Sequence, residues 1–94
     1  MSYLDIFTVK DSKAEAYLQP FFVHNEAVAL RIITNLVEDD GHQFGKNPED
    51  YSLWFLGKYD ESTGELINMV DKKHICNLSD LKRPFVAQSE VEEM

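Results

Sequence analysis

Alternation of apolar and polar positions predicts a strand near the start of the chain. The run YLDIFTV, Tyr3 to Val9, is rich in β-branched and aromatic side chains, and its successive residues point to opposite faces. A turn at Asp11-Ser12-Lys13 and a connection over residues 14–23 follow. We expect Phe21 and Phe22 to pack or pair within that connection, because burial of their large rings is favourable.

The following segment has the period of an amphipathic helix. Asn25 is a favourable cap residue for the run AVALRIITNLVEDD, and Gly41 is suited to end the helix. Apolar side chains cover more than half of the helix circumference on a wheel of about 100° per residue. One small sheet does not normally cover so wide an apolar face. We therefore expect the excess to contact either the Phe21-Phe22 segment or a second subunit.

The second half of the chain predicts a hairpin. Residues 41–50, GHQFGKNPED, are typical of an exposed loop. Tyr51 to Tyr59 is apolar on both faces at its middle, which is typical of a central strand. The sequence DESTG at 60–64 predicts a tight turn into a strand over 65–70. Weaker patterns predict a short strand at 74–76 and a helical turn at 79–82.

These elements predict an α+β fold. The small, mainly antiparallel sheet has its elements in β-α-β-β order and carries one amphipathic helix packed on one face. A chain of 94 residues has room for one domain, which we place at residues 1–83. Residues 84–94 contain three glutamates and no basic residue, and we expect them to form a flexible acidic C-terminal tail.

Charge and cysteine content narrow the class of protein. Seventeen acidic against nine basic residues give a net charge of −8, which repels a phosphate backbone at long range. The single cysteine, Cys76, cannot form an intramolecular disulfide, and the chain starts without a secretory signal pattern. No apolar stretch approaches the roughly 20 residues that span a bilayer. We therefore expect a soluble protein in a reducing cytoplasm, with no membrane partner.

The sequence lacks the patterns that mark common enzymes. No serine lies in a GxSxG elbow, no glycine-rich loop is spaced to hold a phosphate, and Cys76 has no placed catalytic partner. On a regular strand His74 and Cys76 would share one face, but one cysteine does not supply the paired ligands of a structural zinc site. We expect no catalytic residue, no metal and no cofactor.

The clearest candidate chemistry lies in YSLWFLGKYDESTG, residues 51–64. If the strand is regular, Trp54 and Lys58 share one face and the other rings share the opposite face. An exposed tryptophan beside a lysine is suited to stack a nucleic-acid base and meet a phosphate. The same composition fits scattered solubilising charges around a core tryptophan, and fits that interpretation better. The candidate nucleic-acid-binding residues are Trp54, Lys58, Lys72, Lys73, Lys82 and Arg83.

Several short motifs carry a family resemblance. DSK at 11–13, QPFF at 19–22, NPEDY at 47–51 and the DESTG turn occur in this order within residues 3–70. Together they resemble the small nonstructural protein of gokushoviruses, the single-stranded DNA phages of the Microviridae. The resemblance implies a non-enzymatic, DNA-binding type of protein with a part in single-stranded genome synthesis or packaging. It implies no particular binding residue.

Two functions of different classes follow. The first is a phage protein that binds single-stranded DNA in the cytoplasm of the infected bacterial host and regulates genome synthesis or packaging. The alternative is a homodimeric protein-interaction module that engages phage or host replication proteins, or assembly proteins, without touching DNA. The net charge favours the second function, and the resemblance favours the first.

Overall fold

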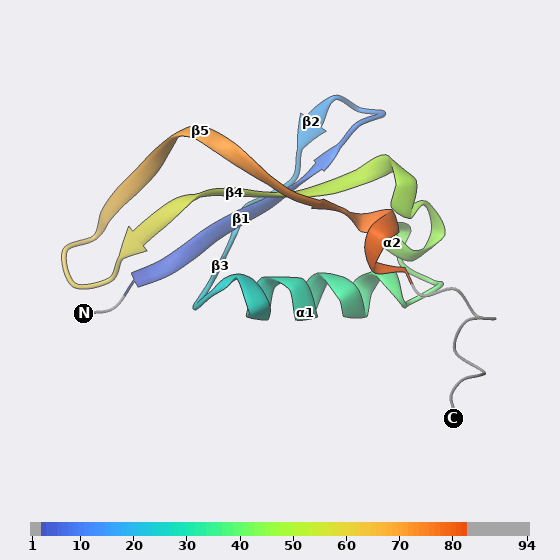
Figure 1. The fold of residues 1–94 in the computed structure, drawn as a ribbon, viewed down its shortest axis with the longest axis horizontal. Helices are drawn as coiled ribbons and strands as arrows, with labels where there is room; N and C mark the ends of the chain where they lie inside the picture. Colours follow the sequence, from blue (N-terminus) through green and yellow to red (C-terminus); the bar gives the residue numbers. More distant parts are fainter. Residues whose placement is uncertain (1–2, 83–94) are drawn as a thin grey trace.

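The computed structural model describes residues 3–82, except for the side chains of Met69 and Val70. The predicted acidic tail at 84–94 lies outside these residues. Strands, helices and two 3₁₀ turns follow one another as Figure 1 shows. Their bounds are β1 (Tyr3–Asp11), β2 (Ala16–Tyr17), β3 (Phe21–Val23), α1 (Glu26–Val37), α2 (Gln43–Lys46), η1 (Pro48–Asp50), β4 (Tyr51–Asp60), β5 (Glu65–Asn77) and η2 (Leu78–Leu81).

The strands form one five-stranded antiparallel sheet with α1 lying along one face (Figure 1). The order across the sheet is β2-β1-β4-β5, and β3 pairs with β1 along the same edge as β2. The predicted α+β class and the helix on one face are therefore confirmed. Two short strands precede α1 that the predicted β-α-β-β order did not contain. Strand β5 lies at the opposite edge of the sheet.

The hydrophobic core lies between this sheet and α1. Phe7 and Leu53 come from neighbouring strands and are completely buried, and the Phe7 ring lies 5.3 Å from the Phe55 ring, centroid to centroid. Burying each such side chain contributes roughly 1.5–3 kcal/mol. From α1 and η2 the core receives Ala29, Ile33, Val37 and Leu78.

The two helices begin at side-chain caps. Asn25 Oδ1 accepts a hydrogen bond from the Val28 N–H at 2.9 Å, which confirms the predicted cap of α1. The predicted loop at 41–50 contains α2 instead, where His42 Nδ1 accepts from the Phe44 N–H at 3.0 Å. Phe44 is buried against Tyr51, so tertiary packing stabilises a turn whose glycine and asparagine indicated a loop. None of the helices between residues 3 and 82 has the length and hydrophobicity to span a bilayer.

Strand β4 contains a bulge opposite β1. Phe7 pairs with Phe55, but the preceding Ile6 pairs with Gly57, so Leu56 is an extra residue on β4. An extra residue reverses the faces of every side chain beyond it. The faces predicted from a regular strand are therefore correct only up to Phe55.

The bulge separates Lys58 from Trp54. Beyond it Lys58 pairs with Asp5 on the α1 side of the sheet, whereas Tyr59 lies on the same side as Trp54. The Lys58 Nζ is 2.7 Å from Asp5 Oδ1, an ion pair between opposite strands. The expectation that Lys58 stands beside Trp54 is wrong, because the alternation it used assumed an unbroken strand.

Strand β5 crosses β4 closely at Gly57. Gly57 pairs with Asn68, but the next pair along the two strands joins Phe55 to Lys73. Residues 69–72 therefore have no partner on β4. The backbone of Gly57 has φ 155°, which side chains rarely permit, and a Cβ there would overlap the Ile67 carbonyl oxygen. The glycine thus allows the two strands to approach where β5 begins to arch away.

Substitution of Gly57 tests this close approach. We expect Gly57→Ala to lower the free energy of unfolding by about 3 kcal/mol or more, because it adds both steric overlap and backbone strain. Gly64→Ala is the matched control, since Gly64 also has positive φ (78°) but has no atom within 4 Å of the added Cβ. Gly64→Ala should lower the free energy of unfolding by only about 1–2 kcal/mol. Urea unfolding followed by circular dichroism measures both, and equal losses would contradict the close approach.

Candidate nucleic-acid interface

A cluster of rings and lysines lies on the face of the sheet opposite α1. We call it the aromatic-basic patch and define it as Lys10, Tyr17, Trp54, Lys72 and His74. Four strands supply it, because Lys10 of β1 pairs with Tyr17 of β2 and Trp54 of β4 pairs with His74 of β5. Cross-strand partners share a face of the sheet, so the pairing itself brings these side chains together.

Trp54 contacts the other two rings edge to face. Trp54 lies 5.1 Å from His74 at 74° and 6.3 Å from Tyr17 at 80°, both measured between ring centroids and planes. The Trp54 Nε1 donates a hydrogen bond to Ser52 Oγ at 2.8 Å, which fixes the orientation of the indole. Tyr17 is 42% exposed and His74 is exposed, whereas Trp54 between them is half-buried, so the cluster is open to solvent at its two outer rings.

Two ammonium groups lie close to these rings. Lys72 Nζ is 5.3 Å from the Tyr17 centroid and 5.8 Å from the Trp54 centroid, and Lys10 Nζ is 5.7 Å from the Tyr17 centroid. These distances fit cation-π contacts. Within residues 3–82 neither ammonium makes an ion pair with a carboxylate. Both charges therefore remain available to an anionic ligand.

The structure brings only part of the candidate set together. Trp54 and Lys72 lie in the patch. Lys58 lies on the α1 side with Asp5, and Lys73 pairs with Phe55 and so also belongs to the α1 side. Lys58 and Lys73 therefore lie apart from Trp54, because the bulge and the side-chain alternation of β5 direct them to the other face.

Lys82 has a different environment from the patch. Its Nζ donates to the carbonyl oxygens of Val37 at 3.3 Å and Gly45 at 3.1 Å, and it contacts Asp40 Oδ1 at 3.0 Å. A cation there satisfies one backbone oxygen at the end of α1 and one in α2, and it complements the dipole of α1. Lys82 thus anchors η2 to the helix layer. Arg83 lies outside the described residues.

Three patch residues were absent from the candidate set. Lys10 could have been found by continuing the alternation of β1 one residue past Val9, which places it on the face of Thr8. Tyr17 gave no such signal, because a two-residue strand has no readable period. His74 was considered only as a metal ligand.

The expected sharing of one face by His74 and Cys76 is wrong. His74 pairs with Trp54 and Cys76 pairs with Leu53, and the extra residue between them, Ile75, turns them to opposite faces. Across the part of the chain that the structure describes, no three potential metal ligands of the His, Cys, Asp or Glu type gather in one place.

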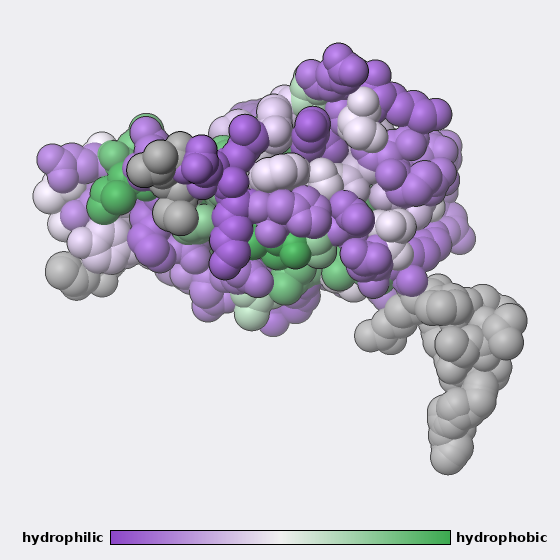
Figure 2. Space-filling view, turned by 45° about the horizontal axis from the view of Figure 1, so that its top comes forward, coloured by the Kyte–Doolittle hydropathy of each residue, from purple (hydrophilic) through white to green (hydrophobic). Residues whose placement is uncertain are grey.

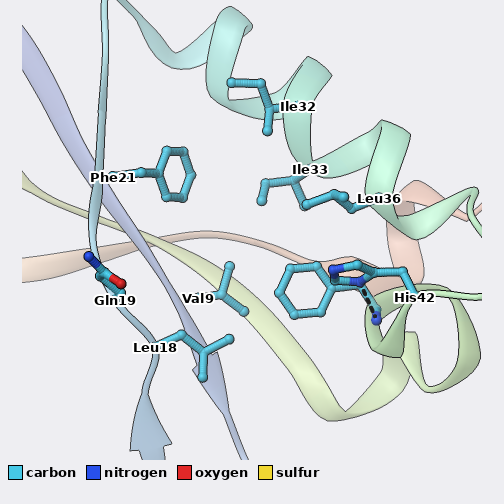
Figure 3. Close-up of a pocket in the computed structure, with 9 residues that line it drawn as sticks. Val9, Leu18, Gln19, Phe21, Ile32, Ile33, Leu36 and His42 are labelled. Carbon is cyan, nitrogen blue, oxygen red and sulfur yellow. Dashed lines mark hydrogen bonds between the residues drawn. The ribbon is translucent and has the colours of Figure 1, made fainter.

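A separate feature is an apolar cavity of about 240 Å³ between α1 and residues 18–21 (Figure 3). Phe21, Ile32 and Leu36 form much of its wall. Part of the wide apolar face of α1 is thus covered by the Phe21 segment, one of the two partners that the sequence left open. Its described lining carries no carboxylate or ammonium group, so it does not suit a nucleic-acid backbone.

The anchoring role of Lys82 can be tested by Lys82→Met, which keeps the aliphatic stem. We expect the free energy of unfolding to fall by about 1–2 kcal/mol, since two buried carbonyls lose a charged donor that is itself partly exposed. Lys46→Met, at an exposed position, should change it by less than about 0.5 kcal/mol. Urea titrations measure the free energy of unfolding of both variants. If Lys82→Met leaves it unchanged, the anchoring role of Lys82 is ruled out.

Cys76 should be a slowly reacting thiol. Burial, and then the carboxylates of Asp80 and Glu26, raise the pKa of Cys76 above its ordinary value, so less thiolate is present at a given pH. We expect its reaction with a disulfide reagent at pH 8 to be slower in the folded protein than in urea. Equal rates in the two states would contradict a shielded thiol.

Comparison with known proteins supports a viral origin. Residues 4–81 match the family described as Phage ORF5 protein, which covers nearly all of the described domain. No curated protein and no solved structure gives a significant match. The narrower gokushovirus resemblance stays a prediction. Because the match extends over most of its length, the chain belongs to the Phage ORF5 protein family.

Proposed function

We propose that this phage protein has a non-enzymatic role in which the aromatic-basic patch binds single-stranded DNA. In this role it regulates the synthesis or packaging of a single-stranded genome in the cytoplasm of the infected bacterial host. The observation that carries the proposal is the gathering of three rings and two ammonium groups, without carboxylate partners, on one exposed face. The family membership supports the setting.

Stacking supplies the larger part of the expected affinity. A base stacked on an aromatic side chain contributes about 1–3 kcal/mol, whichever base it is. Tyr17, Trp54 and His74 are turned steeply to one another, so bases would contact separate rings rather than one continuous surface. Unpaired bases are needed for such contacts, which favours single strands over duplex DNA.

Electrostatics should contribute modestly. The net charge of −8 opposes the approach of a phosphate backbone, and among residues 3–82 only Lys10 and Lys72 flank the rings. With about 0.7 counterions released per neutralised phosphate, two contacts predict a slope near −1.4 in log affinity against log salt. A protein that coats DNA through many lysines would show a much steeper slope.

The alternative function is a homodimeric protein-interaction module that engages replication or assembly proteins without DNA. The net charge favours it, as do exposed apolar side chains away from the patch, among them Phe22, Leu66 and Ile67. Binding of DNA at low salt separates the two functions, because attraction to phosphate is strongest there.

DNA binding can be measured with a labelled oligothymidine at two salt concentrations, by anisotropy and by fluorescence of Trp54, the only tryptophan. We expect saturable quenching with the shallow salt slope given above. Tyr17→Ala should weaken binding about 5- to 100-fold through lost stacking. Lys72→Ala should reduce the magnitude of the slope by about 0.7.

Lys58→Ala is the matched control, because Lys58 carries the same charge on the opposite face. It should leave affinity and slope unchanged. No binding at low salt would refute the DNA proposal and favour the alternative. A loss with Lys58→Ala as large as with Lys72→Ala would show that the patch is not the site.

A further inference from the structure

The free edge of β5 is the most unusual surface of the molecule. Ile67 and Lys73 both pair with residues of the α1 side, and His74 pairs with Trp54 on the other side. Yet residues 69–72 have no partner on β4, and nothing in the described chain pairs with the outer edge of β5. The strand therefore presents unpaired backbone groups over many residues.

Apolar side chains accompany this free edge. Leu66 is 58% exposed and Ile67 is 47% exposed, and they point to opposite faces because they pair with Tyr59 and Lys58, respectively. Figure 2 shows apolar surface at the end of the molecule where the β4–β5 hairpin lies, and a second apolar area nearer the middle of this side. The sequence ELINMVD at 65–71 has four apolar residues interrupted by a single asparagine, Asn68, whereas edge strands are normally protected by lysine or proline.

The charges along β5 complement a second copy of the same strand. In an antiparallel pair related by a two-fold axis at residue 69, Glu65 lies opposite Lys73 of the second copy. The two-fold axis repeats this pair. Both residues belong to the α1 side of the sheet, so each pair shares a face. Leu66 then lies opposite Lys72, whose aliphatic stem can cover it. This register places no like charges opposite one another.

We infer that the free edge of β5 binds a second copy of this chain, forming one continuous sheet across the dimer with residue 69 at its centre. The pairing supplies backbone partners along the outer edge of β5 and contacts for Leu66 and Ile67. A two-fold axis perpendicular to the sheet keeps equivalent faces on the same side. The two aromatic-basic patches then face the same way, with their His74 residues roughly 33 Å apart along the strand direction.

The test is the mass of the full chain in solution without DNA, by sedimentation equilibrium. We expect twice the 10.9 kDa of one chain. Glu65→Lys and Lys73→Glu should each raise the dissociation constant of the dimer about tenfold, because each creates like-charge pairs twice. The double variant restores opposite charges and should return close to the original constant. Circular dichroism verifies that each variant is folded.

Ile67→Lys and Ile32→Lys form a matched pair, since both replace an exposed isoleucine, at β5 and on α1. Only Ile67→Lys should give monomers. Three results would each overturn this pairing. The first is a monomeric parent protein, and the second is a dimer broken by Ile32→Lys but not by Ile67→Lys. The third is a double charge variant whose dissociation constant is no lower than those of the single variants. Because DNA is absent from the measurement, a monomer that still binds DNA overturns the dimer alone, and a dimer that binds none overturns the DNA proposal alone.

Discussion

Pairing of β1 with β4 on both sides of the extra residue Leu56 is the constraint on which the rest of the structure depends. Before the bulge it places Phe55 under α1 and Trp54 on the opposite face. Beyond the bulge it reverses the faces, so that Lys58 meets Asp5 at 2.7 Å. One residue thus decides which cation lies beside the tryptophan.

The same bulge shapes the other edge of the sheet. At Gly57 the absence of a side chain lets β5 come close to β4, and immediately afterwards β5 departs from its partner for residues 69–72. Lys72 reaches the Tyr17 and Trp54 rings from this departing segment. The departing segment of β5 thus adds Lys72 to a patch whose rings are brought together by pairing between strands.

The two faces of the sheet carry different kinds of side chain. The α1 face holds the core and its anchors, including Lys82 at the end of the helix. The opposite face carries polar and aromatic groups that lie outside the core. Trp54 is one of them, and its Nε1 donates a hydrogen bond to Ser52 on the same face. A strongly acidic chain can therefore still present a small cationic surface, since the patch contains no carboxylate.

Local patterns in the sequence determined the strand near the start, the Asn25 cap, the helix and the hairpin, because each depends on neighbouring residues and on a period of 2 or 3.6. They did not determine α2, whose histidine cap gains its stability from the packing of Phe44. They also did not determine the patch. Lys10, Tyr17 and His74 meet Trp54 only through pairing between distant strands, and one unpaired residue, Leu56, moved Lys58 away from it. The tertiary structure decided these features because hydrogen bonding between strands fixes the register, and alternation along a single strand cannot reveal where that register shifts.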